Sequence, residues 1–85
     1  MYKLVFTKSA LKFLRKMPAN EEKRVRIKLA QLAKDPYVIN ANVTKLQNRA
    51  GFRLRVGDWR VIYDIIDNEL VILVLNVGSR GGIYR

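Results

Sequence analysis

The sequence predicts an α+β fold: an N-terminal strand, an antiparallel helical hairpin and then an antiparallel three-stranded meander, which together form a roughly four-stranded sheet. Two observations predict this order. Apolar residues recur at helical spacing in the first half of the chain, whereas they alternate with polar residues or form short apolar runs in the second half. With 85 residues, the chain is expected to form a single domain over residues 1–85.

The first half of the chain predicts one strand followed by two helices. Residues 2–6 indicate a short strand, and either Thr7 or Ser9 can cap the helix that follows. Pro18 ends this helix, because proline lacks the amide hydrogen and clashes with the preceding turn. A second helix ends before Pro36, since the residue before a proline disfavours helical geometry. The short connection between the helices predicts that they are antiparallel.

The second half of the chain predicts β structure. Strands are expected over 51–56, 59–66 and 69–77, with a possible short piece at 45–46. The run 70–77 is almost wholly apolar, which suits a central strand covered on both faces, or on one face by helices and on the other by a ligand or partner. We expect the helices to pack on one face of the sheet and the N-terminal strand to add at one edge. The other face of the sheet then stays open.

A tight hairpin carries the most informative residues. Gly57-Asp58, with glycine first, predicts a two-residue type II′ turn that places Arg55 directly opposite Arg60. Directly opposed residues point to the same side of a sheet. Two like charges in such positions destabilise a sheet, and a bound phosphate would relieve their repulsion. We expect an apolar side formed by Phe52, Leu54, Val56, Trp59, Val61 and Tyr63, and a basic side formed by Arg53, Arg55 and Arg60.

The composition narrows the possible chemistry. The chain contains neither cysteine nor histidine, which excludes disulfides, thiol chemistry and the commonest general base. Its seven Asp and Glu residues are scattered, so neither a metal site nor a cofactor is expected. The sequence shows no apolar run typical of a signal peptide or a transmembrane helix. These features predict a cytoplasmic protein.

The net charge of +10 predicts an anionic partner, which could be nucleic acid, an acidic protein or an anionic membrane surface. Lysine and arginine mix as far as Lys45, and every later basic residue is arginine. Arginine presents a planar fork that binds phosphate through two parallel hydrogen bonds, whereas lysine acts as a point charge. The specific anion contacts are therefore expected from the arginines of the second half, which are Arg49, Arg53, Arg55, Arg60, Arg80 and Arg85.

Three segments of the sequence resemble the RelE group of the RelE/ParE toxin superfamily. They are residues 54–63, 77–80 and 83–85, with the sequences Leu-Arg-Val-Gly-Asp-Trp-Arg-Val-Ile-Tyr, Val-Gly-Ser-Arg and Ile-Tyr-Arg. The similarity extends over nearly the whole chain, including the N-terminal strand and the helical hairpin. It implies the toxin of a type II toxin–antitoxin system: an mRNA interferase that cleaves the messenger in the ribosomal A site and inhibits translation.

The resemblance also implies a set of site residues. The group has a basic pair before the turn, an arginine after it, an arginine after the last strand and a C-terminal tyrosine. Some members carry lysines as the basic pair, and others in the superfamily use a Glu/His pair, which a chain without histidine cannot form. In this chain the corresponding residues are Arg53, Arg55, Arg60, Arg80 and Tyr84.

Metal-free RNA cleavage would use these arginines to stabilise charge. The 2′-hydroxyl attacks the adjacent phosphate, and fixed guanidinium donors stabilise the charge that develops there. Tyr84 is expected either to act as a base or to stack on a nucleobase. We expect the scissile phosphate to be contacted by Arg55, Arg60 and Arg80, and the RNA to be bound further by Arg53, Arg49, Lys45 and Arg85.

The partners implied are messenger RNA on the ribosome, ribosomal RNA and a cognate antitoxin protein, with no membrane partner. A ParE-like gyrase inhibitor is the nearest alternative, because it shares the fold and needs no arginine–tyrosine set. A non-catalytic nucleic-acid-binding module, or an inactive toxin that still binds an antitoxin, would use the same basic face without cleavage. Contacts with ribosomal RNA or an acidic antitoxin, or solvation alone, are the possible roles of Lys12, Lys16, Arg24 and Arg26.

Overall fold

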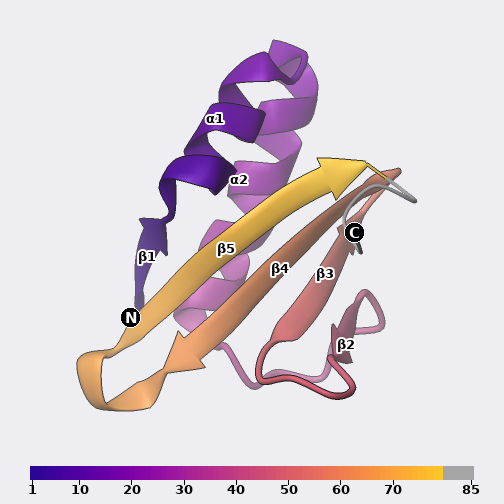
Figure 1. The fold of residues 1–85 in the computed structure, drawn as a ribbon. Coiled ribbons are helices and arrows are strands. Elements are labelled where there is room, and N and C mark those ends of the chain that lie inside the picture. Colours follow the sequence, from indigo (N-terminus) through magenta and orange to yellow (C-terminus); the bar gives the residue numbers. More distant parts are fainter. Residues whose placement is uncertain (80–85) are drawn as a thin grey trace.

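The computed structural model describes residues 1–79, which form one mixed sheet with two helices on a single face (Figure 1). In chain order the elements are β1 (Lys3–Phe6), α1 (Lys8–Lys16), α2 (Ala19–Lys34), β2 (Val43–Lys45), β3 (Phe52–Val56), β4 (Trp59–Ile66), the 3₁₀ turn η1 (Asp67–Glu69) and β5 (Val71–Ser79). The strands lie in the order β1-β5-β4-β3-β2. β1 runs parallel to β5, and every other neighbouring pair is antiparallel. The predicted α+β architecture is confirmed.

The sheet has five strands instead of the roughly four predicted, because β2 adds at the edge beyond β3. This strand covers Val43–Lys45, slightly earlier than the short piece expected at 45–46. Its register pairs Val43 with Leu54 and Lys45 with Phe52. A strand of three residues is too short to show an alternating pattern, so its position is set by the hydrogen bonds that the edge of β3 offers.

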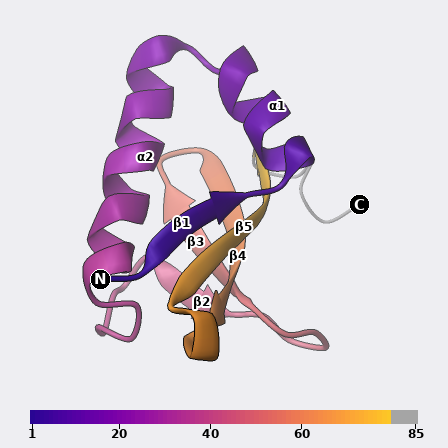
Figure 2. The ribbon, with the colours of Figure 1, turned by 90° about the vertical axis from the view of Figure 1, so that its left-hand side faces the viewer.

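Local signals place the helices where the sequence predicts them. Thr7 caps α1: its Oγ1 accepts a hydrogen bond from the backbone nitrogen of Ala10 at 3.2 Å and donates one to the carbonyl oxygen of Leu75 at 2.7 Å. The second bond attaches the start of α1 to β5. Pro18 precedes α2, which lies against β1 and β3 while α1 lies along β5 (Figure 2). Neither helix of residues 1–79 has the length and apolar character that a membrane crossing needs.

The hydrophobic core lies between the helices and the sheet. Both helices and the four longer strands contribute to it, and the apolar side of the β3–β4 hairpin faces the helices as predicted. The other face of the sheet is covered by no helix of residues 1–79 (Figure 1). The largest fully buried side chains are Leu14, Val25, Leu29, Leu32, Leu54, Val61, Tyr63, Ile72 and Val74.

A bulge explains why Val74 and Val77 of β5, three residues apart, both face the core. The register shifts between Ile62 and Tyr63 of β4, which leaves Leu75 of β5 as the extra residue. The bulge returns Val77 to the same face as Val74, and both side chains are buried in the core. β5 also has neighbours on both sides, β1 and β4, so it lies inside the sheet as its apolar sequence predicts.

Candidate nucleic-acid interface

The β3–β4 hairpin has the turn that the sequence predicts. Gly57 has a positive φ of +59° and Asp58 does not, which suits a type II′ turn. The register places Arg55 opposite Arg60, with Arg53 two residues before Arg55 on the same strand. Because side chains alternate along a strand, all three arginines lie on the side of the sheet that faces away from the helices. We call Arg53, Arg55 and Arg60 the arginine face.

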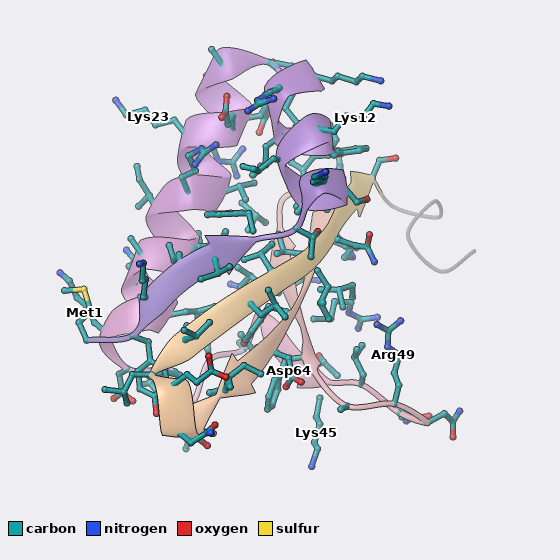
Figure 3. All side chains as sticks on the ribbon, turned by 60° about the vertical axis from the view of Figure 1, so that its left-hand side comes forward. Met1, Lys12, Lys23, Lys45, Arg49 and Asp64 are labelled. Carbon is teal, nitrogen blue, oxygen red and sulfur yellow. The ribbon has the colours of Figure 1, made fainter. Side chains whose placement is uncertain are left out.

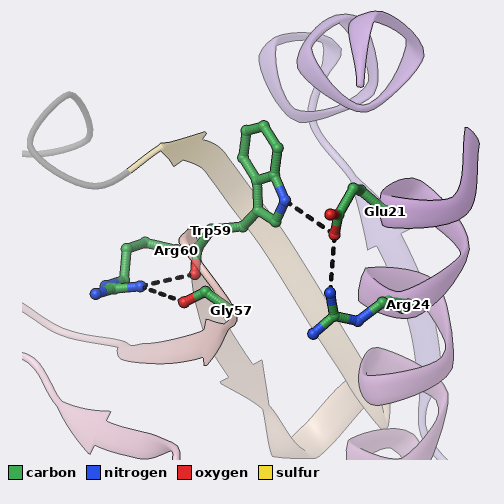
Figure 4. A network of polar contacts seen from close by, with 5 residues as sticks. All are labelled: Glu21, Arg24, Gly57, Trp59 and Arg60. Carbon is green, nitrogen blue, oxygen red and sulfur yellow. Dashed lines mark hydrogen bonds and ion pairs between the residues drawn. The ribbon is translucent and has the colours of Figure 1, made fainter. Parts of the chain in front are cut away.

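The guanidinium group of Arg60 folds back over the turn (Figure 4). Its Nη1 donates hydrogen bonds to the carbonyl oxygens of Gly57 at 3.2 Å and Trp59 at 3.1 Å. Both acceptors are backbone groups, so the side chain is oriented without losing its charge to a carboxylate.

The guanidinium group of Arg55 is held from the neighbouring segment. Its Nη2 donates to Oδ1 of Asn42 at 3.2 Å, and its backbone nitrogen donates to the carbonyl oxygen of the same asparagine at 2.8 Å. Within residues 1–79, neither Arg55 nor Arg60 faces a carboxylate at ion-pair distance. Among residues 1–79, two opposed positive charges, one on the exposed Arg55 and one on the half-buried Arg60, therefore have only neutral acceptors. An anion placed between them would be stabilised by both.

The other predicted RNA-binding residues are more dispersed. Lys45 lies opposite Phe52, so its side chain is on the helical side of the sheet and away from the arginine face. Arg49 lies in the exposed loop between β2 and β3 (Figure 3). Ser79, the last described residue, lies opposite Trp59 beside the hairpin turn. The predicted site residues Arg80, Tyr84 and Arg85 lie outside the described residues.

Residues 4–84 match the model of a family described as the ParE toxin of type II toxin–antitoxin system, parDE. The chain belongs to this toxin family. It is 28% identical over 79 residues to the mRNA interferase toxin RelE of Escherichia coli K12. The aligned residues cover 93% of this chain and 83% of that protein. The membership in the RelE/ParE superfamily that the motifs predict is thereby confirmed.

Solved structures of RelE proteins share the fold of this toxin. The isolated E. coli RelE toxin superposes with a TM-score of 0.82 at 28% identity, over 99% of this chain and 89% of that one. RelE in the archaeal RelE–RelB complex from Pyrococcus horikoshii superposes with a TM-score of 0.80 at 28% identity, over 95% of this chain and 97% of that one. The similarity therefore covers both helices and the sheet.

Two features of the toxin's interface are missed by sequence reasoning. Asn42, which orients Arg55, lies in a segment that the sequence presents only as a polar connection. Trp59 is predicted only as part of the apolar side, yet its indole nitrogen also donates to Oε2 of Glu21 at 3.3 Å. The signal for the second contact is present but weak: an indole on the apolar side of a sheet usually finds a hydrogen-bond acceptor for its nitrogen when it is buried.

The described tyrosines of this toxin lie away from the arginine face. Tyr63 is fully buried on the helical side of the sheet, and this burial raises its pKa to about 12. Tyr2 and Tyr37 both donate to the carboxylate of Asp67, at the opposite end of β4 from the hairpin turn. Within residues 1–79, no group of three or more acidic residues could hold a metal ion. The arginine face itself offers an anion guanidinium donors.

Proposed function

We propose that this chain is an mRNA interferase that cleaves messenger RNA in the A site of the ribosome and is neutralised by a cognate antitoxin. The observation that carries the proposal is the pair Arg55 and Arg60, which stand opposite each other with only neutral acceptors among the described residues. The matched relative is named an mRNA interferase, and a solved neighbour is the E. coli RelBE toxin–antitoxin complex. Because translation takes place in the cytoplasm, the toxin acts there.

The arginines act on the phosphate while RNA supplies its own nucleophile. The 2′-oxygen attacks the adjacent phosphorus, the bond from phosphorus to the 5′-oxygen breaks, and one proton passes from the 2′-hydroxyl to the departing oxygen. Arg55, Arg60 and Arg80 stabilise the charge on the phosphate as it develops, and Arg53 helps to hold the backbone. Outer contacts with RNA come from Arg49 and Arg85, whereas Lys45, on the helical side of the sheet, is not placed to share them.

Tyr84 is the tyrosine available to this reaction. Tyr2, Tyr37 and Tyr63 are excluded by their positions, because none of them lies on the arginine face. A tyrosine among arginines acts either as a base with a lowered pKa or as a ring that stacks on a nucleobase. Arginine itself is a poor proton-transfer group because it stays charged at physiological pH.

Primer extension on a messenger in a purified translation system tests the proposal. Wild type should produce new 5′ ends inside ribosome-bound codons, and Arg60→Ala should lower the cleavage rate by roughly 10²–10³-fold, the usual cost of removing one such donor. Arg15→Ala is the matched control, because Arg15 is an exposed arginine in the last turn of α1. Full activity of Arg60→Ala would show that the arginine face is not the site. Retained cleavage by Tyr84→Phe would assign Tyr84 to stacking, whereas its loss would assign it to proton transfer.

Gyrase inhibition is the second candidate, because the family model that matches the chain is named for ParE. Two assays, one of DNA supercoiling and one of messenger cleavage, distinguish a gyrase inhibitor from an mRNA interferase. Inhibition of DNA supercoiling by the wild-type chain, without new 5′ ends in the translation assay, would establish the gyrase inhibitor. Cleavage without an effect on supercoiling would establish the interferase.

A further inference from the structure

The indole of Trp59 lies in a corner formed by both helices and the hairpin. Its Nε1 donates to Oε2 of Glu21 in the first turn of α2 at 3.3 Å. Its ring meets Phe13 of α1 edge to face, with centroids 5.9 Å apart and an interplanar angle of 73°. The first residue of β4 is therefore fixed from the helical side of the sheet by one hydrogen bond and one aromatic contact.

Arg24 joins the same contact and touches the turn. Its Nη1 donates to the Glu21 oxygen that also accepts from the indole, at 3.0 Å (Figure 4). A methyl group added to Gly57 would lie 3.4 Å from Nη2 of Arg24, so the guanidinium group lies directly against the turn. Glu21 thus contacts Trp59 directly and Gly57 through Arg24.

The hairpin turn that Glu21 and Arg24 contact from the helical side also provides the hydrogen-bond acceptors for Arg60. The two carbonyl oxygens that accept from Nη1 of Arg60 belong to Gly57 and Trp59. Glu21 contacts Trp59 through its indole, and Arg24 lies against Gly57. A shift of the turn would carry Arg60 with it, and a misplacement of about 1 Å in an active site can cost on the order of 10²-fold in rate.

We propose that Glu21 and Trp59 are positioning residues for Arg60, acting through the carbonyl groups of the hairpin turn. The inference rests on the proposed function, in which Arg60 stabilises the scissile phosphate. Neither Glu21 nor the indole nitrogen needs to touch RNA, because each acts from the opposite side of the sheet.

The first test compares cleavage of ribosome-bound messenger by Trp59→Phe, Glu21→Ala and Glu21→Gln. Trp59→Phe and Glu21→Ala should lower kcat by about 10- to 100-fold with little change in KM, since a displaced Arg60 weakens stabilisation of the transition state. Glu21→Gln keeps a carbonyl acceptor for the indole and should restore part of the rate. Glu22→Gln is the matched control, because Glu22 is the neighbouring acid and pairs with Arg26 instead, at 2.9 Å.

The second test separates positioning from general stability. In an Arg60→Ala background, Glu21→Ala should have no further effect on kcat if Glu21 acts through Arg60. An equal loss of kcat in both backgrounds would overturn the inference, as would unchanged kcat in Glu21→Ala and Trp59→Phe while Arg60→Ala is inactive. Full activity of Arg60→Ala would instead reject the proposed site itself, so the two failures are distinguishable.

A spectroscopic measurement checks the contact without using activity. Trp59 is the single tryptophan of the chain, so its fluorescence emission reports the surroundings of this indole alone. Glu21→Ala should shift the emission of the folded protein, and Glu22→Gln should leave it unchanged. Identical spectra for wild type and Glu21→Ala would show that the indole does not use this carboxylate.

Discussion

At the scale of single residues, the sheet separates two kinds of polar group by burial. Arg55 and Arg60 lie on the side away from the helices, where neutral acceptors orient them and solvent or an anion can reach them. On the helical side, the hydroxyl of Tyr63 is buried and forms no hydrogen bond within the described chain. Its ring stacks on Phe52, with centroids 5.5 Å apart and planes inclined by 22°. The ring therefore stabilises the core, whereas the hydroxyl opposes this because it loses its hydrogen bonds to water.

Tyr63→Phe should stabilise the protein, because it keeps the stacked ring and removes the buried hydroxyl. We expect the free energy of unfolding to rise by about 1 kcal/mol and Tm by about 4–8 °C. Urea and thermal unfolding followed by circular dichroism would measure both. Tyr37→Phe is the control and should lower stability instead, since its hydroxyl donates to Asp67. A less stable Tyr63→Phe would show that the hydroxyl has a partner in solution.

At the scale of the element, the hairpin turn joins the two faces of the sheet. Gly57 supplies the positive φ that the turn needs, and the carbonyl groups of the turn orient Arg60. The same turn contacts α2 through Arg24 and Trp59. A two-residue turn has few other conformations that keep the register of β3 and β4, so the opposed arginines depend on it.

Gly57→Ala should weaken this turn. An L-residue at positive φ costs about 1–2 kcal/mol, whereas the added methyl group would make only ordinary van der Waals contact with the end of the Arg24 side chain. The free energy of unfolding in urea should fall by that amount. Asp58→Ala, at the other central position of the turn, should change it by less than about 0.5 kcal/mol. Equal stability of the two variants would contradict the turn described here.

At the scale of the whole molecule, three distant segments meet at the end of the sheet opposite the hairpin turn. The carboxylate of Asp67 accepts hydrogen bonds from Tyr2 at 2.6 Å and from Tyr37. These bonds join the N-terminus, the loop after α2 and the turn between β4 and β5. They lower the pKa of Asp67 and raise that of Tyr2, while the pKa of Tyr37 rises to about 12.

The stabilisation from this contact should depend on pH at both extremes. A carboxyl group whose pKa is lowered on folding stabilises the protein above its ordinary value of 3.8, and the effect is lost as pH falls through the lowered value. A phenol whose pKa is raised stabilises it below the ordinary value of 10.0, and the effect is lost as pH rises through about 12. The difference in Tm between wild type and Asp67→Asn should therefore be constant between pH 3.8 and pH 10.0, and it should shrink at lower and at higher pH.

A neighbouring acid provides the control for the pH experiment. Glu69 lies two residues further along the same turn and accepts no tyrosine hydroxyl among the described residues. Glu69→Gln should leave both the Tm and its pH dependence close to those of wild type. A difference between wild type and Asp67→Asn that does not vary from acid to neutral pH would show that the ionised carboxylate is not what binds the two tyrosines.

Much of the fold could be predicted from residues that are close in the sequence. The Thr7 cap, the Pro18 break and the alternation of the hairpin are local signals, and all three appear in the structure. The opposed arginines followed from the same local pattern, since the two-residue turn at Gly57 sets the register of β3 and β4. The short strand expected at 45–46 lies at Val43–Lys45 instead, because a three-residue strand carries no pattern that would fix its bounds.

The sequence by itself determined the type and order of the main elements and the placing of arginines on one side of the hairpin, because caps, turns and periodicity act over a few residues. Only the tertiary structure decided which distant groups orient those arginines. Asn42 reaches Arg55 because β2 adds to the edge of β3, and Glu21 reaches Trp59, 38 residues away, because α2 packs on the sheet. Such contacts depend on how separate segments pack together, and no local pattern records that.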